Sequence, residues 1–511
     1  MTAAALATHP AGSGAAPRPV LLNRSVQFVW FLIFAMATRW YALGDLNYQE
    51  DELLFFYYGQ RMHEGLLPYV DLWDRKPPSL FLLYYFFAGI SHSVYVYQIA
   101  GLLSVAMTAQ VIALLCERIG ARVAGGTLAG TLYLCMLLEF GGAGGQAPIF
   151  YNLPMAVAAL LVISRRDSLA QGKTGPALFA AMLLAGLAIT FKQTAVFEAA
   201  FLGCYALFVL ARGGMPQAKL VRTGLAMMLT GAVPMLAWAL FYAVSGHFYE
   251  FWHAMVLSNF TRSYHFDANL VFRARVFTVA LGPVLLIAAA GLAGHGQDVA
   301  ARVGRNFVIG WLVAAFAGFL VIPNLIDHYV MPLMVPLAIA TSPLLSRRPI
   351  GWIAGVVMIS LYVAACPALD PGRASRSRSE VMSLIQEMHQ RDPVMRLFVF
   401  DGPVYLNVLT GSNPPTPLAF PLHLAALPER NVSHLDTAGE VRKILAWRPT
   451  TVVLQKESRP VELENAETNA LVRDYVSSQC RSHYARRIHD MYGKVDLDLY
   501  TDCAGNAAAR P

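Results

Sequence analysis

Three consecutive acidic residues near the start of the chain, at positions 50–52, could supply a proton acceptor. Asn47 precedes them and can cap a helix over about residues 49–64, which Gly65 would end. Asp51 then lies near the N-terminus of that helix, where the helix dipole favours an ionised carboxylate. Such a carboxylate could act as a general base toward a hydroxyl or an amine. The alternative is that the three side chains only stabilise the start of a helix at a membrane surface.

A second charged cluster directly precedes a long apolar run. The segment DLWDRKPPSLFLLYYFF, residues 71–87, places Arg75 and Lys76 before Pro77 and Pro78. The two prolines cannot continue a regular hydrogen-bonded ladder, so they fix the direction of the chain at this point. From the residues alone, Lys76 could be a cation whose stem lies along apolar surface while its head reaches water.

Lysine is rare in the first 367 residues, where it occurs four times. Lys173 and Lys219 fall in connections with other basic residues, but Lys192 lies at a turn between two apolar segments. An ionisable group is expensive at such a position and is therefore a functional candidate. Lys192 and the neighbouring Gln193 could bind an anionic group, or Lys192 could simply anchor a helix end.

The elements that must position these groups are helices that span a membrane. The chain has 511 residues, of which 56% are hydrophobic and 14% charged, with a mean hydropathy of +0.47. A soluble domain carries about a quarter charged residues. The formal charge of +7 is spread mainly over short connectors between apolar stretches. The sequence shows no basic patch with interleaved aromatic residues, so nucleic-acid binding is not expected.

Apolar stretches of spanning or nearly spanning length predict about 11 transmembrane helices. Arginine and lysine clusters occupy alternate connections between them, which predicts a cytoplasmic N-terminus. Residues 1–20, rich in Ala, Gly and Pro, lack the features of a secretory signal and are predicted to be a disordered cytoplasmic tail. The stretches run at about 26–43, 94–115, 123–139, 149–164, 176–191, 195–211, 223–245, 276–293, 306–322, 329–345 and 350–367.

The same charge pattern assigns the other connections to the outer side of the membrane. They include a first outer loop at 44–93, in which the run Ser79 to Ser91 is too short to span and is predicted to be a re-entrant or interfacial helix. The outer connection 246–275 contains cations that could bind a phosphate, arginine through two parallel hydrogen bonds, or could pair with Asp267. The basic residues are Arg262, His265, Arg273 and Arg275, and Tyr264 lies among them.

The composition changes after about residue 368, which predicts a small soluble α/β domain on the outer side over residues 368–511. The polar segment RASRSRSE, residues 373–380, is predicted to be a linker. RLFVF (396–400) and TVVLQ (451–455) resemble short buried strands, while GEVRKILAW (439–447) and ENAETNALVRDYV (464–476) have helical spacing. Cys480 and Cys503 could form a disulfide if this domain faces an oxidising compartment.

The first outer loop resembles that of a known family of membrane enzymes. Its pattern is Glu50-Asp51-Glu52, then Gly65-x-x-Pro68-Tyr69-x-Asp71-x-Trp73-Asp74-x-Lys76-Pro77-Pro78. This resembles the GT-C superfamily of glycosyltransferases that use polyprenyl-phosphate sugars, in the branch of protein mannosyltransferases, lipid A aminoarabinose transferase and rhizobial lipopolysaccharide galacturonosyltransferases (family 39/83-like). Weaker matches follow in the same order at GLAITFKQTAVF (186–197), FYEFWHAMVLSNF (248–260) and DHYVMPLMVPLAI (327–339).

The resemblance implies a GT-C fold over residues 21–367 and roles for individual residues. Asp51 aligns with the catalytic base of the family's Asp-Glu pair, with Glu52 beside it, and Lys76 aligns with a lysine that contacts phosphate. His328 and Tyr329 resemble a pair near the sugar phosphate. Further candidates for donor binding are Arg75, Lys192, Gln193, Arg262 and Tyr264, and the loop motif is completed by Tyr69, Asp71, Asp74, Pro77 and Pro78.

By the same resemblance, the expected enzyme moves a sugar from a polyprenyl-phosphate donor to lipopolysaccharide, another envelope glycan, a lipid or a protein. It would act at the periplasmic face of a bacterial inner membrane, in contact with membrane lipids. The chain departs from the aminoarabinose transferase pattern at Leu54, Phe55 and Arg75. This removes the position that usually supplies a metal ligand, so no metal or other cofactor is predicted. The second outer loop offers Gln146 and Asn152 where many relatives carry an acidic residue.

Two other classes of protein fit parts of the sequence. A multi-span transporter or flippase of a lipid-linked or anionic substrate would also have many spans and intramembrane charge, although transporters bind near the membrane midplane. A non-catalytic assembly protein would tolerate the loss of Asp51. The sequence identifies neither the sugar nor the acceptor.

Overall fold

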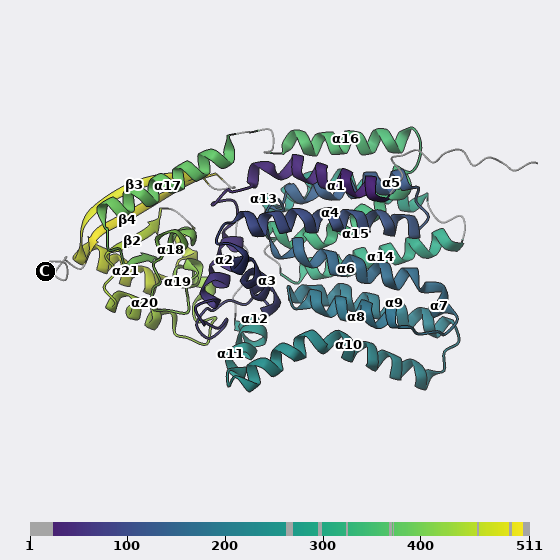
Figure 1. Cartoon of the computed structure of the whole chain (residues 1–511), viewed down its shortest axis with the longest axis horizontal. Coiled ribbons are helices and arrows are strands. Elements are labelled where there is room, and N and C mark those ends of the chain that lie inside the picture. Colours follow the sequence, from purple (N-terminus) through teal and green to yellow (C-terminus); the bar gives the residue numbers. More distant parts are fainter. Residues whose placement is uncertain are drawn as a thin grey trace, which may run out of the picture.

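Long helices that lie side by side make up most of the computed structural model, and a small sheet lies at one end of them (Figure 1). The structure describes residues 24–261, 269–294, 299–322, 325–366, 370, 372–456, 459–489 and 493–503. The predicted tail at 1–20 lies outside these residues, as do Arg262, Tyr264, His265 and Asp267.

Each of the eleven predicted apolar stretches coincides with a helix. Seven helical segments in the described part are long and apolar enough to cross a membrane, and four further apolar helices are shorter. The chain is therefore a multi-span membrane protein, as predicted, while the count of eleven spans stays a prediction. The helices at the eleven predicted stretches include α1, which is in neither group, and leave out the shorter apolar helix Pro78–Ile90. They are α1 (Arg24–Arg39), α4 (Tyr95–Arg118), α5 (Val123–Leu138), α6 (Ala147–Ser164), α8 (Pro176–Ile189), α9 (Val196–Arg212), α10 (Gln217–Val244), α13 (Asn269–Ala293), α14 (Val299–Leu320), α15 (Met334–Leu345) and α16 (Ile350–Ala365).

Short helices lie between the long helices and the sheet (Figure 1): α2 (Glu50–Met62), α3 (Pro78–Ile90), α11 (Phe248–Trp252) and α12 (Ser258–Thr261). Helix α2 begins one residue later than predicted and is not capped by Asn47. Gln49 holds the N-cap position in an extended conformation, and its side chain makes no capping hydrogen bond to the helix. The Asn47 amide instead donates a hydrogen bond to the carbonyl of His489, 2.8 Å away. A long-range contact thus replaces the predicted local cap.

Helix α17 (Arg373–Arg391) corrects the prediction of a linker at 373–380. Its buried positions Val381, Leu384, Ile385 and Met388 recur at helical spacing and form one apolar face. The segment RASRSRSE is the polar first part of this amphipathic helix, and its Ser377 hydroxyl contacts the Asp45 carboxylate.

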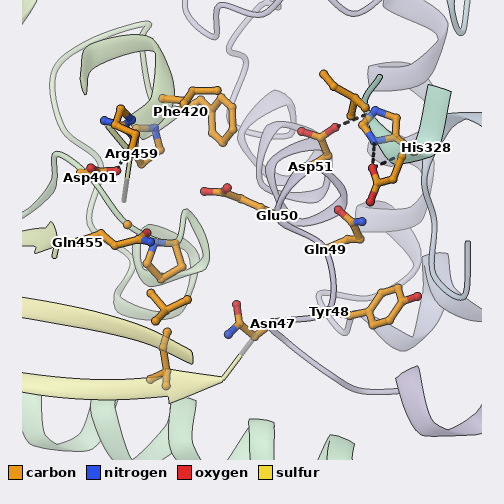
Figure 2. Close-up of a pocket in the computed structure, with 18 of the residues that line it drawn as sticks. Asn47, Tyr48, Gln49, Glu50, Asp51, His328, Asp401, Phe420, Gln455 and Arg459 are labelled. Carbon is orange, nitrogen blue, oxygen red and sulfur yellow. Dashed lines mark hydrogen bonds and ion pairs between the residues drawn. The ribbon is translucent and has the colours of Figure 1, made fainter. Parts of the chain in front are cut away.

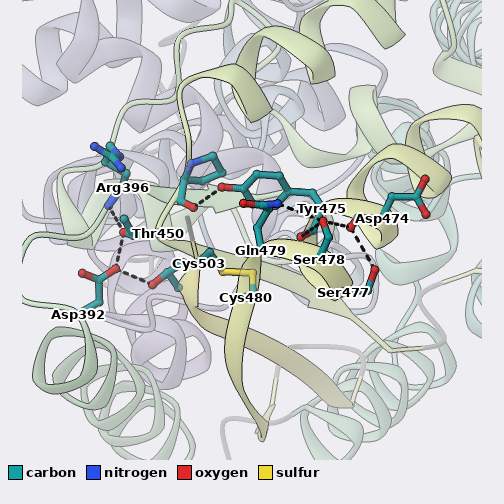
Figure 3. The surroundings of a disulfide bond; sticks show 12 residues. Asp392, Arg396, Thr450, Asp474, Tyr475, Ser477, Ser478, Gln479, Cys480 and Cys503 are labelled. Carbon is teal, nitrogen blue, oxygen red and sulfur yellow. Dashed lines mark hydrogen bonds between the residues drawn. A yellow bond between two sulfur atoms is a disulfide. The ribbon is translucent and has the colours of Figure 1, made fainter. Parts of the chain in front are cut away.

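The sheet contains β1 (Leu397–Val399), β2 (Thr451–Gln455), β3 (Cys480–His489) and β4 (Lys494–Cys503), in the order β1-β2-β4-β3. β1 and β2 are the two predicted strands and are parallel, whereas the β3 and β4 pairings are antiparallel. A disulfide joins Cys480 to Cys503 across β3 and β4 (Figure 3). Besides α17, the α-helices of this part are α18 (Tyr405–Thr410), α19 (Pro421–Ala425), α20 (Thr437–Ala446) and α21 (Ala466–Gln479). The small C-terminal α/β part is therefore present; we call residues from Arg373 onward the C-terminal unit.

Two hydrophobic clusters cross the predicted boundary at residue 368. The largest extends from the long helices into α17 and β1. The second combines Trp73 of the first outer loop with Phe398, Val452 and Val472 of the C-terminal unit. The loop that carries the charged motif is therefore packed into the core of the C-terminal unit.

Candidate active site

Helix α2 places Asp51 in its first turn, facing two basic side chains. The Lys76 ammonium nitrogen is 3.4 Å from Asp51 Oδ2, and His328 Nε2 is 3.8 Å from the same oxygen. Burial alone would raise the pKa of Asp51, but its electrostatic interactions with Lys76, His328 and Lys192 lower this pKa to about 2. Asp51 is therefore ionised at neutral pH, and three residues far apart in the sequence meet at one carboxylate.

Side chains of the loop motif hold the backbone at Lys76. The Tyr69 hydroxyl donates to the Lys76 carbonyl over 2.8 Å, and Asp74 Oδ1 accepts the Lys76 N–H over 3.2 Å. Tyr69 is fully buried and has a φ of 71°, a backbone conformation that is uncommon outside glycine. Burial lowers the pKa of Lys76, but the carboxylates of Asp51 and Asp74 raise it to a net value above the ordinary one.

Hydrogen bonds connect the loop motif to two other parts of the molecule and close a turn within it. The Trp73 N–H donates to the Pro417 carbonyl over 2.9 Å, which connects the loop to the C-terminal unit. Asp71 Oδ2 accepts the Leu67 N–H over 2.9 Å and closes the turn before it. Pro77 is the N-cap of α3 and Pro78 its first residue, a position that suits proline. The next residue, Ser79, donates its N–H to the carbonyl of Thr190, close to Lys192.

Glu52, the next residue of α2, is fully buried, and its carboxyl group contacts Gly144 instead of the basic residues. Burial raises the pKa of Glu52 to about 8, while the backbone N–H groups of Gly145 and Gln146 oppose this shift. Its carboxyl group packs so closely on Gly144 that a Cβ there would lie 2.2 Å from Oε2. The structure thus separates the two predicted catalytic carboxyls: Asp51 is ionised, whereas Glu52 is neutral at pH 7 and packs α2 against the second outer loop.

The other predicted donor-binding residues occupy different surroundings. Arg75 forms an ion pair of 2.9 Å with Glu429 of the C-terminal unit. The Lys192 ammonium lies 3.8 Å from the centre of the Tyr329 ring, and His328 Nδ1 is 3.2 Å from Asp327. Gln193 Nε2 donates to the Met255 carbonyl over 2.8 Å, so this amide contacts the 253–257 segment. Lys192, His328 and Tyr329 are thus gathered near Asp51.

A cavity of about 460 Å³ lies between these residues and the C-terminal unit (Figure 2). One side is formed by the start of α2, Lys76 and the segment 326–329. The other side is formed by Asp401, Phe420, Gln455 and Arg459, none of which the sequence patterns had indicated. Asp401 and Gln455 lie at the ends of the two predicted strands. A prediction that these strands pair in parallel would have placed both residues at one edge of the sheet and indicated them as site candidates.

Among the described residues, no three His, Cys, Asp or Glu side chains are grouped so that they could hold a metal ion. We therefore assign no step to a metal. The cavity contains an ionised carboxylate, a lysine beside it, and polar and aromatic groups opposite. Such an arrangement can accept a proton at Asp51 and stabilise negative charge that develops near Lys76.

The arrangement of helices, outer-loop elements and C-terminal sheet is a GT-C-like fold. The crystal structure of ArnT from Cupriavidus metallidurans bound to undecaprenyl phosphate matches it with a TM-score of 0.59 at 14% identity, over 94% of this chain and 98% of that chain. The crystal structure of the same protein in the apo state matches with a TM-score of 0.57 at 13% identity, over 96% and 100%. At these identities the similarity establishes the fold, and it confirms the predicted resemblance at that level. No protein-family model and no curated protein matches the sequence.

Proposed function

We propose that this chain is a glycosyltransferase that moves a sugar from a polyprenyl-phosphate donor to an envelope acceptor. The observation that carries the proposal is the Asp51 carboxylate, which is ionised inside a cavity and lies 3.4 Å from Lys76. A GT-C-like fold, and the undecaprenyl phosphate bound by the ArnT relative, support a lipid phosphate as part of the donor. The acceptor is lipopolysaccharide, another glycan, a lipid or a protein.

In the proposed reaction, Asp51 accepts the proton of the acceptor hydroxyl or amine. The oxygen or nitrogen freed of that proton forms a bond to the anomeric carbon of the sugar, and the bond from that carbon to the phosphate oxygen breaks. The electron pair stays on the phosphate oxygen, so polyprenyl phosphate leaves with one more negative charge. Lys76, with Lys192 and His328 nearby, stabilises this charge, and electrostatic stabilisation of this kind commonly contributes most to the rate enhancement of an enzyme.

The proposed orientation places the cavity and the C-terminal unit on the outer, periplasmic side of a bacterial inner membrane. Basic residues in alternate connections support this orientation. The disulfide in the C-terminal unit also supports it, because disulfides persist in oxidising compartments. The proposed boundary of the soluble part is near residue 368, although its core is shared with the first outer loop.

The test is cleavage of a labelled donor by the purified protein. Undecaprenyl-phosphate donors carrying a hexose, a uronic acid or an aminopentose are incubated with protein and with envelope extract, and the label is followed by mass spectrometry. We expect label to leave one of these lipids and to appear in the extract. Uptake of intact donor into vesicles without cleavage would contradict the proposal and would favour a transporter.

A further inference from the structure

The C-terminal edge of β1 and β2 opens onto the same cavity as Asp51. Because the two strands are parallel neighbours, their carboxyl ends meet at one edge of the sheet. Asp401 follows β1 by two residues, Gln455 is the last residue of β2, and Arg459 follows four residues later. In open α/β sheets, ligands bind at the carboxyl ends of parallel strands. Figure 2 shows these three side chains across the cavity from Asp51.

Asp401, Phe420, Gln455 and Arg459 form one wall of the cavity. Its chemistry differs from that of the side that carries Lys76. Asp401 and Arg459 form an ion pair of 2.8 Å, so their charges compensate each other. The amide of Gln455 adds a donor and an acceptor, and the Phe420 ring and Pro403 add apolar surface. The cations near Asp51 suit a phosphate, whereas this neutral wall suits a group with many hydroxyls. Carboxylate, guanidinium and amide can hydrogen-bond to hydroxyls, and an aromatic ring can pack on the apolar face of a sugar.

The backbone beside Asp401 requires glycine. Gly402 has a φ of +147°, in a region that is essentially restricted to glycine. The requirement comes from the backbone and not from lack of space, because a Cβ at this position would make only ordinary contacts with Val453 and Val399, at 3.4 and 3.5 Å. This conformation turns the chain at the end of β1 and keeps both Asp401 and Pro403 in the cavity lining. Residues in such conformations are often found where a ligand is held.

We infer that this wall is the acceptor site, and that the group bound there is a saccharide. The wall is defined as Asp401, Phe420, Gln455 and Arg459. The inference rests on the proposed function, because it assigns the acceptor to the side of the cavity opposite the basic residues. A sugar held by the wall extends a hydroxyl toward Asp51, while the phosphate of the donor stays beside Lys76. The acceptor is then a glycan or the sugar portion of a glycolipid.

The test measures transfer as a function of acceptor concentration. The acceptor probe is envelope glycan isolated from a strain that lacks the gene, and the donor is the labelled undecaprenyl-phosphate sugar that the wild type cleaves. The double variant Asp401→Asn/Arg459→Gln removes both charges together and leaves neither buried alone. Arg487→Gln/Asp496→Asn is the matched control, because this exposed pair lies on the same sheet but does not line the cavity. Phe420→Leu is the second wall variant.

We expect the acceptor KM to rise about tenfold or more in both wall variants and to stay unchanged in the control. The donor KM should not change in any of them. A wall variant with normal expression and an unchanged acceptor KM overturns the acceptor site, as does a labelled product that is a protein or a lipid without sugar. In both cases the proposed function survives. A wild type that cleaves no donor overturns the proposed function, and the acceptor site with it.

Discussion

Asp51 has neighbours that change its proton affinity in opposite directions. Burial raises its pKa, and the surrounding cations lower it to about 2. A carboxylate with this pKa is ionised but is a weak base. When a donor phosphate binds beside Lys76, it shares the positive charge that Asp51 otherwise receives, so the proton affinity of Asp51 increases. Donor binding is therefore expected to activate the base.

Replacing Lys76 by methionine should weaken the use of the donor. The change keeps most of the stem but removes the charge, so we expect the donor KM to rise about 10- to 100-fold, the effect of losing a charged contact of about 1.4 to 2.8 kcal/mol. Donor saturation curves measure this effect. Lys173→Met is the control, because Lys173 is exposed in a connection between membrane helices. A donor KM equal to that of the control would refute the phosphate contact.

Glu52 should make the stability of the protein depend on pH. Its pKa is about 8 in the folded protein against an ordinary 4.5, so the folded state binds more protons than the unfolded state between these values. Stability therefore decreases as the pH rises from about 4.5 to about 8, by up to about 1.4 kcal/mol for each pH unit. Glu52→Gln should reduce this decrease and stabilise the protein at pH 8. Thermal unfolding in detergent at pH 5 and pH 8 measures it, with Glu50→Gln as control. A slope identical to that of the wild type would contradict the neutral Glu52.

Contacts with the C-terminal unit fix the position of the first outer loop. Trp73 is buried in the core of that unit, and the Tyr58 hydroxyl donates to the Trp73 carbonyl over 2.8 Å. Two residues further on, Arg75 is paired with Glu429. Lys76 is the next residue after Arg75. Its position therefore depends on contacts between the loop and residues more than 340 positions away, such as Glu429.

Trp73→Ala should loosen the loop without removing any charged group. Removing a buried tryptophan side chain costs about 3 to 5 kcal/mol, and here the cost falls on the contact between the loop and the C-terminal unit. We expect faster amide hydrogen exchange over residues 65–78 and a loss of transfer. Trp252→Ala, at an exposed position of α11, is the control. Unchanged exchange in the loop would show that other contacts hold Lys76.

Sequence patterns predicted the helices well because each helix depends on its own composition. They predicted β1 and β2 for the same reason, since both are short buried runs. β3 was missed because its side chains are mostly exposed and include several arginines. α17 was missed because its first turns are polar. The site residues differ in the same way. The loop motif indicated Asp51 and Lys76, but only the tertiary fold brings Glu429 to the loop and places Asp401 and Arg459 across the cavity from it.

At the scale of the whole molecule, the cavity belongs to neither part alone. The outer-loop elements supply Asp51 and Lys76, and the C-terminal unit supplies the wall opposite. The two hydrophobic clusters that cross between the parts keep these surfaces in register. Because the cavity depends on both parts, the proposed reaction requires the complete chain and requires that the C-terminal unit lie on the donor's side of the membrane.

The state of the six cysteines tests this orientation. If the C-terminal unit is periplasmic, Cys480 and Cys503 should be oxidised in cells. Free thiols are trapped by acid and blocked under denaturing conditions. Disulfides are then reduced, and the thiols that this releases are labelled with a maleimide polymer. We expect two labels per chain in the wild type and none in Cys480→Ser/Cys503→Ser. A wild type without labels would place this unit in a reducing compartment and would contradict the topology.

The central claim is that Asp51 accepts the proton of the acceptor. The most direct measurement is the initial rate of sugar transfer by Asp51→Asn, which keeps the size of the side chain but removes the charge. We expect a rate at least 100-fold below that of the wild type, the lower end of the usual contribution of a general base, with donor binding retained. Glu50→Gln, one position away on the same cavity, should keep most of the activity. Transfer by Asp51→Asn at the rate of this control would contradict the role of Asp51 as the base.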